Sequence, residues 1–255
     1  MATPQPLTAP VSYNPATDLL TGRIVLVTGA GDGLGQAAAR AYARHGATVI
    51  LLGRTVSKLE HVYDEILAAG GSQPAITPMD LARATARDYE AMVTAIEKEF
   101  GRLDGILHSA AELGTLTPLE LYDPELWTRV MQVNFNAAYL ITRLCLDLLR
   151  RSNDASVIFS SSDVARQARA YWGAYAAAGG ALERLMEIWA DELEQNTHIR
   201  FNSLDPGPVA TGLRAQAYPG ESPDQHPRPD EVMGPYLYLM GPDSRGITGR
   251  AFSIR

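Results

Sequence analysis

The sequence predicts a single-domain α/β protein with a Rossmann fold, a doubly wound parallel sheet flanked by helices. Three observations support this prediction. Strand-like and helix-like segments alternate along most of the 255 residues, a glycine-rich turn follows the first predicted strand, and no repeat or change in composition marks a second domain. Chains of this length commonly form one three-layer domain. Strands that alternate with helices favour a parallel sheet that is covered on both faces.

Each element is predicted from its hydrophobic period and its stop signals. Short β-branched runs predict strands, and apolar residues spaced three and four positions apart predict helices. In chain order we expect a strand over 24–28, a helix over 34–45, a strand over 47–52, a helix over 56–69, a strand over 75–79, a helix over 88–100, a strand over 103–109, a helix over 124–150, a strand over 156–160, a helix over 171–194, a strand over 199–204 and a last strand near Phe252.

Two segments do not fit the alternation. Residues 1–22 contain four prolines and no sustained period, which predicts an extended N-terminal arm before a domain over 23–255. Residues 206–230 are rich in proline, glycine and aspartate and follow a predicted strand. Open α/β sheets place ligand-binding loops at such positions, so this stretch is a candidate substrate loop.

Composition excludes several classes of partner. The formal net charge of −7 opposes attraction to nucleic acid or to anionic membrane surfaces. No apolar run approaches the ~20 residues that span a bilayer, and residues 1–4 lack the features of a signal peptide, so we expect a cytoplasmic protein. The scattered histidines and the single Cys145 give no metal-ligand spacing, and Cys145 is expected to be a buried apolar residue.

The glycine-rich turn at residues 28–35 lies between the first predicted strand and the first predicted helix. Glycines there allow the backbone to approach a pyrophosphate, and the helix N-terminus supplies a positive dipole. The alternative is a tight strand-to-helix turn without a ligand. The candidate cofactor-binding residues of this turn are Thr28, Gly29, Gly33, Leu34 and Gly35.

The cofactor type is read from the residue that follows the second predicted strand. NAD enzymes of this layout usually present an acidic residue to the ribose 2′-hydroxyl, whereas an arginine accommodates a 2′-phosphate. This chain has Gly53-Arg54, so Arg54 favours NADP(H) over NAD(H), and Lys58 is a candidate helper. The alternative is that both cations are solvated surface charges.

Several motifs follow one another in an order typical of one family. They are the pattern T-G-x-x-x-G-x-G at 28–35, Met79-Asp80-Leu81, Val133-Asn134, the pair Ser162 and Tyr175 thirteen positions apart, and Pro206-Gly207-Pro208-Val209-Ala210-Thr211. Over about residues 23–250 the chain resembles the short-chain dehydrogenase/reductase family. Segments 166–175 and 237–245 look most like its bacterial YciK-type branch.

The resemblance implies an oxidoreductase that transfers hydride between a nicotinamide cofactor and a small carbonyl or alcohol substrate. Ser162 would polarise the substrate oxygen, Tyr175 would exchange the proton, and Asn134 would hold a relay water. The resemblance also implies a homodimer or homotetramer. The cofactor-contacting positions that it implies are Asp80, Leu81, Ser109, Ala110, Tyr175, Pro206, Gly207 and Val209.

One departure from the family pattern concerns activity. The family has a lysine four residues after the tyrosine, where its charge favours the phenolate, and this chain has Gly179. Tyr175 should then stay protonated, unless Arg166 or Arg169 takes the place of the lysine. The alternative function is therefore a catalytically impaired nucleotide-binding or scaffold protein on the same fold.

A second departure lies at residues 108–111, where the family's N-N-A-G is replaced by His-Ser-Ala-Ala. His108 could be read as a catalytic base. A histidine that closes a buried strand is more often a satisfied core residue, and this reading is preferred here.

Overall fold

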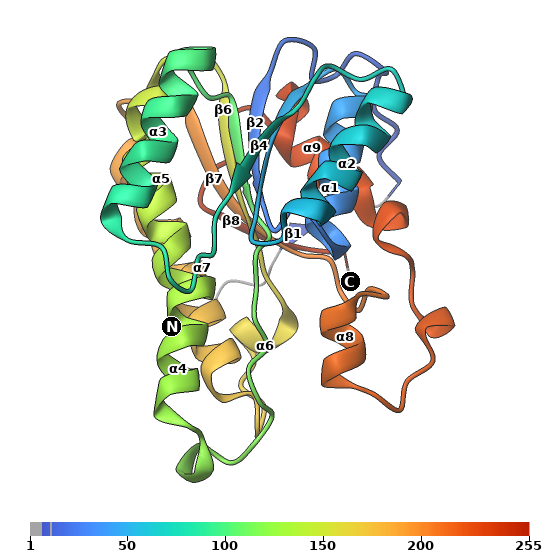
Figure 1. The fold of residues 1–255 in the computed structure, drawn as a ribbon, viewed down its shortest axis with the longest axis vertical. Coiled ribbons are helices and arrows are strands. Elements are labelled where there is room, and N and C mark those ends of the chain that lie inside the picture. The colour runs from blue at the N-terminus through green and yellow to red at the C-terminus, as the bar shows by residue number, and fades with distance from the viewer. Residues whose placement is uncertain (1–6, 11, 255) are drawn as a thin grey trace.

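The strands form one parallel sheet. The structure is a computed structural model that describes residues 7–10 and 12–254, and its eight strands follow the order β1-β8-β7-β6-β5-β2-β3-β4 (Figure 1). Every neighbouring pair is parallel, which confirms the predicted fold class. The strands are β1 (Leu7–Thr8), β2 (Ile24–Thr28), β3 (Thr48–Gly53), β4 (Ala75–Pro78), β5 (Gly105–His108), β6 (Ala155–Ser160), β7 (Ile199–Asp205) and β8 (Arg250–Ser253).

Helices cover both faces of this sheet, with α1, α2 and α9 on one face and α3, α5 and α7 on the other (Figure 1). The α-helices are α1 (Gly33–Arg44), α2 (Val56–Ala68), α3 (Ala86–Phe100), α4 (Pro124–Met131), α5 (Ala137–Arg150), α6 (Asp163–Arg166), α7 (Gly173–Leu193), α8 (Gly212–Ala217) and α9 (Met233–Met240). A π-helical segment, Gln132–Asn136, joins α4 to α5, and short 3₁₀ turns occupy Leu119–Leu121, Pro223–Gln225, Pro229–Val232 and Pro242–Ser244.

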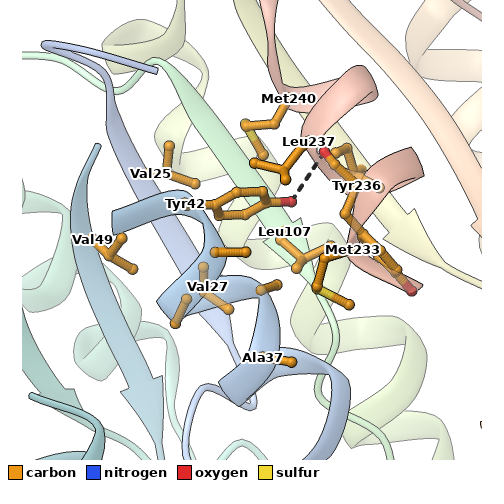
Figure 2. Close-up of a cluster of buried hydrophobic side chains, with 14 of the residues drawn as sticks. Val25, Val27, Ala37, Tyr42, Val49, Leu107, Met233, Tyr236, Leu237 and Met240 are labelled. Atoms are coloured by element: carbon orange, nitrogen blue, oxygen red, sulfur yellow. Dashed lines mark hydrogen bonds between the residues drawn. The ribbon is translucent and has the colours of Figure 1, made fainter. Parts of the chain in front are cut away.

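Two packed cores lie on the two faces of the sheet, as the alternation of side chains along each strand requires. Val25 and Val27 of β2 point toward α1 and α9, whereas Leu26 points toward α3 and α5. Figure 2 shows the first core, in which Tyr42 is fully buried and its hydroxyl donates to the carbonyl oxygen of Tyr236 at 3.5 Å. The second core contains Cys145, which is fully buried as its neighbours predict.

The amino-terminal ends of three strands are tied together by one carboxylate. Asp154, which precedes β6, pairs with Arg23 before β2, with Arg200 of β7 at 3.1 Å and with Arg245 at 3.0 Å. Burial alone would raise the pKa of Asp154, but the positive charges of the arginines outweigh it and hold that pKa below its usual value. This end of the sheet is therefore a structural anchor.

The described part of the N-terminal segment adds a strand that the sequence did not indicate. Leu7 and Thr8 pair with Phe252 and Ser253 of β8, and the amide of Ala9 donates to the Ser253 carbonyl at 2.7 Å. Leu20 is fully buried. Residues 1–6 and 11 of the predicted arm lie outside the described residues.

Within the described ranges, no helix combines the length and the apolar character that crossing a membrane requires.

Candidate cofactor and substrate site

A cavity of about 900 Å³ opens at the carboxyl ends of the strands, where chain order reverses between β2 and β5. Open α/β sheets bind ligands in the crevice at such a switch point. Five strands contribute a residue at or next to their last position: Thr28, Gly53, His108, Ser160 and Asp205. Helices α6 and α8 lie beyond this end of the sheet (Figure 1), and Val164 and Ala217 from them line the cavity.

The glycine-rich turn forms one wall of the cavity through Thr28, Gly29, Gly33 and Leu34. Gly29 has a φ of +69°, and a Cβ built there would lie 2.9 Å from the Cα of Ala110, so only glycine fits. Gly35 does not line the cavity. A side chain there would collide with the carbonyl oxygen of Gly29, so Gly35 allows α1 to pack closely against the turn.

Thr28 holds the turn against the neighbouring loop. Its hydroxyl oxygen accepts from the amides of Ser109 at 3.0 Å and Ala110 at 3.1 Å. Ser109 and Ala110 also line the cavity. The chain segments after β2 and β5 are thus fixed together at the switch point.

The side of the cavity next to the ends of β3 and β4 is lined by Arg54, Asp80 and Leu81, the residues predicted to contact the adenosine end of a cofactor. Arg54 is exposed and has no ion pair or hydrogen bond within the part of the chain that the structure describes. Lys58 pairs with Asp32 at 2.5 Å, and Asp32 also accepts from the amide of Gly33 at 2.8 Å. Asp32 is a lining residue that the sequence analysis did not single out.

Ser162 and Tyr175 meet inside the cavity. Ser162 lies just beyond β6 at the start of α6, Tyr175 lies in the first turn of α7, and their hydroxyls share a hydrogen bond. Burial raises the pKa of Tyr175 above its ordinary value, the bond to Ser162 acts in the opposite direction, and the negative charges of Asp205 and Asp163 raise it further. Tyr175 is therefore a phenol at neutral pH.

Asn134 is buried in the π-helical segment and lines the cavity. Its Oδ1 accepts from the amide of Glu112 at 2.8 Å, and its Nδ2 donates to the Glu112 carbonyl at 3.0 Å. The side chain therefore fixes the loop after β5. The relay-water role stays a prediction.

No cation replaces the family lysine beside Tyr175 among the described residues. A Cβ built on Gly179 would lie 2.8 Å from the Cβ of Ala165, so α6 occupies the space next to this position. Arg166 pairs with buried Glu183 at 3.0 Å, and Arg169 pairs with Asp163 at 2.9 Å. Neither arginine is among the groups that shift the pKa of Tyr175.

His108 has the environment of a core residue. Its Nε2 lies 2.8 Å from the hydroxyl of Thr142, and its ring stacks on Phe159 with centroids 4.9 Å apart. Burial lowers the pKa of His108 to about 3, so the ring is neutral at ordinary pH.

Among the described residues, no group of three or more histidine, cysteine or acidic side chains could hold a metal ion.

The loop after β7 contributes Pro206, Gly207 and Val209 to the cavity. Gly207 has a φ of +66°, and its amide donates to Asp205 Oδ1 at 2.8 Å. The predicted irregular stretch 206–230 also contains α8, whose N-terminus is capped by the hydroxyl of Thr211.

The sequence analysis missed the apolar wall of the cavity around Tyr175. Its residues lie in short elements and connecting segments, where no hydrophobic period shows which side chains face inward. They are Leu113, Val164, Trp172, Leu213 and Ala217.

Comparison with known proteins agrees with this geometry. A family model described as short chain dehydrogenase matches residues 23–222. The uncharacterized oxidoreductase YciK of Escherichia coli (strain K12) is 46% identical over 243 residues, which cover 95% of this chain and 96% of the relative.

Two solved structures are also similar. A short chain dehydrogenase from Pseudomonas syringae is 52% identical with a TM-score of 0.94, and the match covers 95% of this chain and 98% of that one. A short chain dehydrogenase from Escherichia coli CFT073, solved with NADPH, is 46% identical with a TM-score of 0.92, covering 94% and 100% of the two chains. The chain therefore belongs to the short-chain dehydrogenase/reductase family, in its YciK-type branch.

Proposed function

We propose that this protein is an NADP(H)-dependent oxidoreductase that interconverts a small carbonyl compound and its alcohol. The observation that carries the proposal is the hydrogen-bonded pair of Ser162 and Tyr175, which lies in the same cavity as the glycine-rich turn. A group that binds the substrate oxygen and a group that exchanges a proton with it are thereby placed beside a nucleotide-sized cradle.

The cavity residues fit a dinucleotide with a 2′-phosphate. The absence of side chains at Gly29 and Gly33 leaves backbone exposed next to the N-terminus of α1, where a pyrophosphate is favoured. Arg54 is the exposed, unpaired cation of the adenosine side within the described residues, which suits a 2′-phosphate. The relative from Escherichia coli CFT073 that was solved with NADPH supports the same cofactor.

The chain's own groups account for the proton chemistry. NADPH, when bound, supplies the hydride that a carbonyl carbon accepts. The Ser162 hydroxyl donates a hydrogen bond to the carbonyl oxygen, and Tyr175 transfers its phenolic proton to that oxygen as the alcohol forms. The tyrosinate then regains a proton from water. Because Tyr175 is held in its protonated form, the site favours reduction of the carbonyl.

A catalytically impaired nucleotide-binding protein is the second candidate. The contact between Ala165 and the Gly179 position favours it, because no cation in the described structure stabilises the tyrosinate. Cofactor-dependent turnover of any carbonyl by the pure protein would exclude this candidate.

The test is a fluorescence titration with NADPH and NADH on the native protein and on Arg54→Ser. We expect tighter binding of NADPH, and we expect Arg54→Ser to reduce that preference about tenfold by removing a charge-assisted contact. Arg87→Ser, which removes an exposed arginine outside the cavity, is the control and should leave both affinities unchanged. Failure of either nucleotide to bind would contradict the proposal.

A further inference from the structure

We infer that the substrate of this site is a neutral, apolar carbonyl compound, such as a cyclic ketone or an aryl aldehyde, and that anionic carbonyl compounds are rejected. The inference rests on the proposed function and adds the class of substrate to it. Two independent features of the cavity lead to it. Its wall around Tyr175 is apolar, and its arginines are paired while carboxylates act on Tyr175.

The wall around Tyr175 is apolar and aromatic. Leu113, Val164, Trp172 and Ala217 form a buried cluster against which Tyr175 packs. Trp172 meets the Tyr175 ring edge-on, with centroids 5.7 Å apart. A substrate whose oxygen reaches the Tyr175 hydroxyl must therefore place its carbon skeleton against this cluster. Burial of apolar surface, with specific aromatic packing, is the favourable term that such a wall offers.

The arginines near the wall are already paired. Arg129 binds Glu112 at 3.0 Å, and Arg169 binds Asp163 at 2.9 Å. Arg214 binds Glu221 at 2.7 Å, and its guanidinium also lies 3.8 Å over the ring of Tyr218. A substrate carboxylate would meet arginines whose charge is already balanced by a carboxylate, so it would gain less from such a contact than from an unpaired arginine.

The two charged groups that shift the pKa of Tyr175 are negative. The carboxylates of Asp163 and Asp205 both act on the Tyr175 hydroxyl, and both residues line the cavity. An anionic group held near Tyr175 would face these carboxylates, of which Asp163 is partly neutralised by Arg169, in a partly desolvated space where like charges repel. A neutral skeleton has no such cost. The site therefore selects substrates both by their lack of charge and by their apolar surface.

Three ketones of matched ring size test the inference. They are 4-methylcyclohexanone, methyl 4-oxocyclohexanecarboxylate and 4-oxocyclohexanecarboxylate, in which the ester controls for the size of the carboxyl group. With NADPH, we expect kcat/KM for both neutral ketones to exceed that for the carboxylate by at least about tenfold. Equal or higher kcat/KM for the carboxylate would overturn the inference.

Binding without turnover separates this inference from the proposed activity. Calorimetric titration of the three ketones into NADP⁺-loaded protein involves no redox reaction, because both partners are oxidised. The neutral ketones should bind at least about tenfold more tightly than the carboxylate. If this preference appears while no ketone is reduced with NADPH, the substrate-site inference stands and the redox activity fails. Binding of none of the three, or equal binding of all, would overturn the inference.

Trp172 gives a second, variant-based test. Trp172→Ala should weaken binding of 4-methylcyclohexanone about tenfold and leave the affinity for NADPH unchanged, because Trp172 lies on the substrate side. Leu121→Ala, at an exposed position outside the cavity, is the control and should change neither affinity. Unchanged ketone binding in folded Trp172→Ala would contradict the placement of the substrate.

Discussion

The methyl group of Ala165 in α6 lies directly beside the position that the Cβ of a side chain at residue 179 would occupy. A Cβ added to Gly179 would approach it to 2.8 Å, closer than real Cβ contacts allow. α6 is held in this place by the ion pair between Arg166 and Glu183 of α7. The loss of a cation beside Tyr175 is thus built into the packing of two helices, and a single substitution does not reverse it without a clash.

We therefore expect the double variant Ala165→Gly/Gly179→Lys to differ from Gly179→Lys alone. The single variant should be destabilised by about 1–3 kcal/mol through overpacking, with little gain in turnover. In the double variant, an ammonium one helical turn from Tyr175 favours the phenolate, so the pH dependence of alcohol oxidation should shift down by about one pH unit or more. Denaturant unfolding and pH–rate profiles measure the two effects.

Ala177→Lys is the matched control for this prediction. It adds the same charge on an exposed position of α7 and should change neither stability nor the pH profile appreciably. Identical pH profiles for the double variant and the native protein would show that the charge does not reach Tyr175.

The protonation of Tyr175 predicts different pH dependences for the two directions of reaction. Because its pKa is raised, the phenol persists above pH 10, so kcat for carbonyl reduction should be flat from about pH 6 to 9. Oxidation of the alcohol needs the phenolate and should rise with pH throughout that range. Stopped-time assays in both directions measure kcat as a function of pH. A decline of kcat for reduction between pH 6 and 9 would contradict the prediction.

Asp154→Asn should be strongly destabilising because it leaves buried Arg200 without its counter-charge. We expect a loss of about 3–5 kcal/mol in the free energy of unfolding at pH 7. The folded-state pKa of Asp154 is lowered, so its stabilisation is present above the unfolded value near 4 and is lost as the pH falls through the folded value. The difference between native protein and variant should therefore shrink below about pH 4.

Asp147→Asn is the control for that measurement. Asp147 is 84% exposed and pairs with Arg150 on the surface of α5, so its loss should cost less than about 1 kcal/mol. Chemical denaturation at pH 7 and at pH 3 gives both comparisons. Similar losses in the two variants would remove the case for a structural anchor at Asp154.

The family resemblance led us to expect a homodimer or homotetramer. We propose that copies of the chain associate through α5 and α7. Ile188 of α7 is 52% exposed, and Tyr139 of α5 is exposed and stacks on Trp189. Ile188→Glu should lower the molar mass found by light scattering. Leu67→Glu, on α2 at the other face of the sheet, is the control, and an unchanged mass for Ile188→Glu would reject this interface.

The sequence was most informative where apolar residues repeat at a regular period and where clustered glycines mark a tight turn. The seven strands after Arg23 and the long helices were expected, because their buried faces repeat regularly, and the turn at 28–35 was expected from its glycines. α9 was not expected because it is buried all round and has no polar face. The predicted helix 124–150 is interrupted by a π-helical segment around Asn134, a backbone feature without a residue signature.

Within the site, the spacing of Ser162 and Tyr175 anticipated their meeting, but the filling of the Gly179 position could not be foreseen. That contact joins residues from two helices, and their separation depends on how α6 packs. The assignment of Gly35 to the cofactor surface is also qualified by the structure, which places it beneath the turn. Packing distances of this kind are set by tertiary structure, so local sequence does not report them.

The two residues of β1 have a consequence for association in solution. A sheet edge with free amides and carbonyls recruits strands from other molecules, and a segment that covers the edge reduces that tendency. Within the described residues, Leu7 and Thr8 occupy the outer side of β8 over two residue pairs, and they cap this edge of the sheet. Cleavage between Ala9 and Arg23 would release this cap, and the open edge of β8 would then make the protein prone to edge-to-edge aggregation.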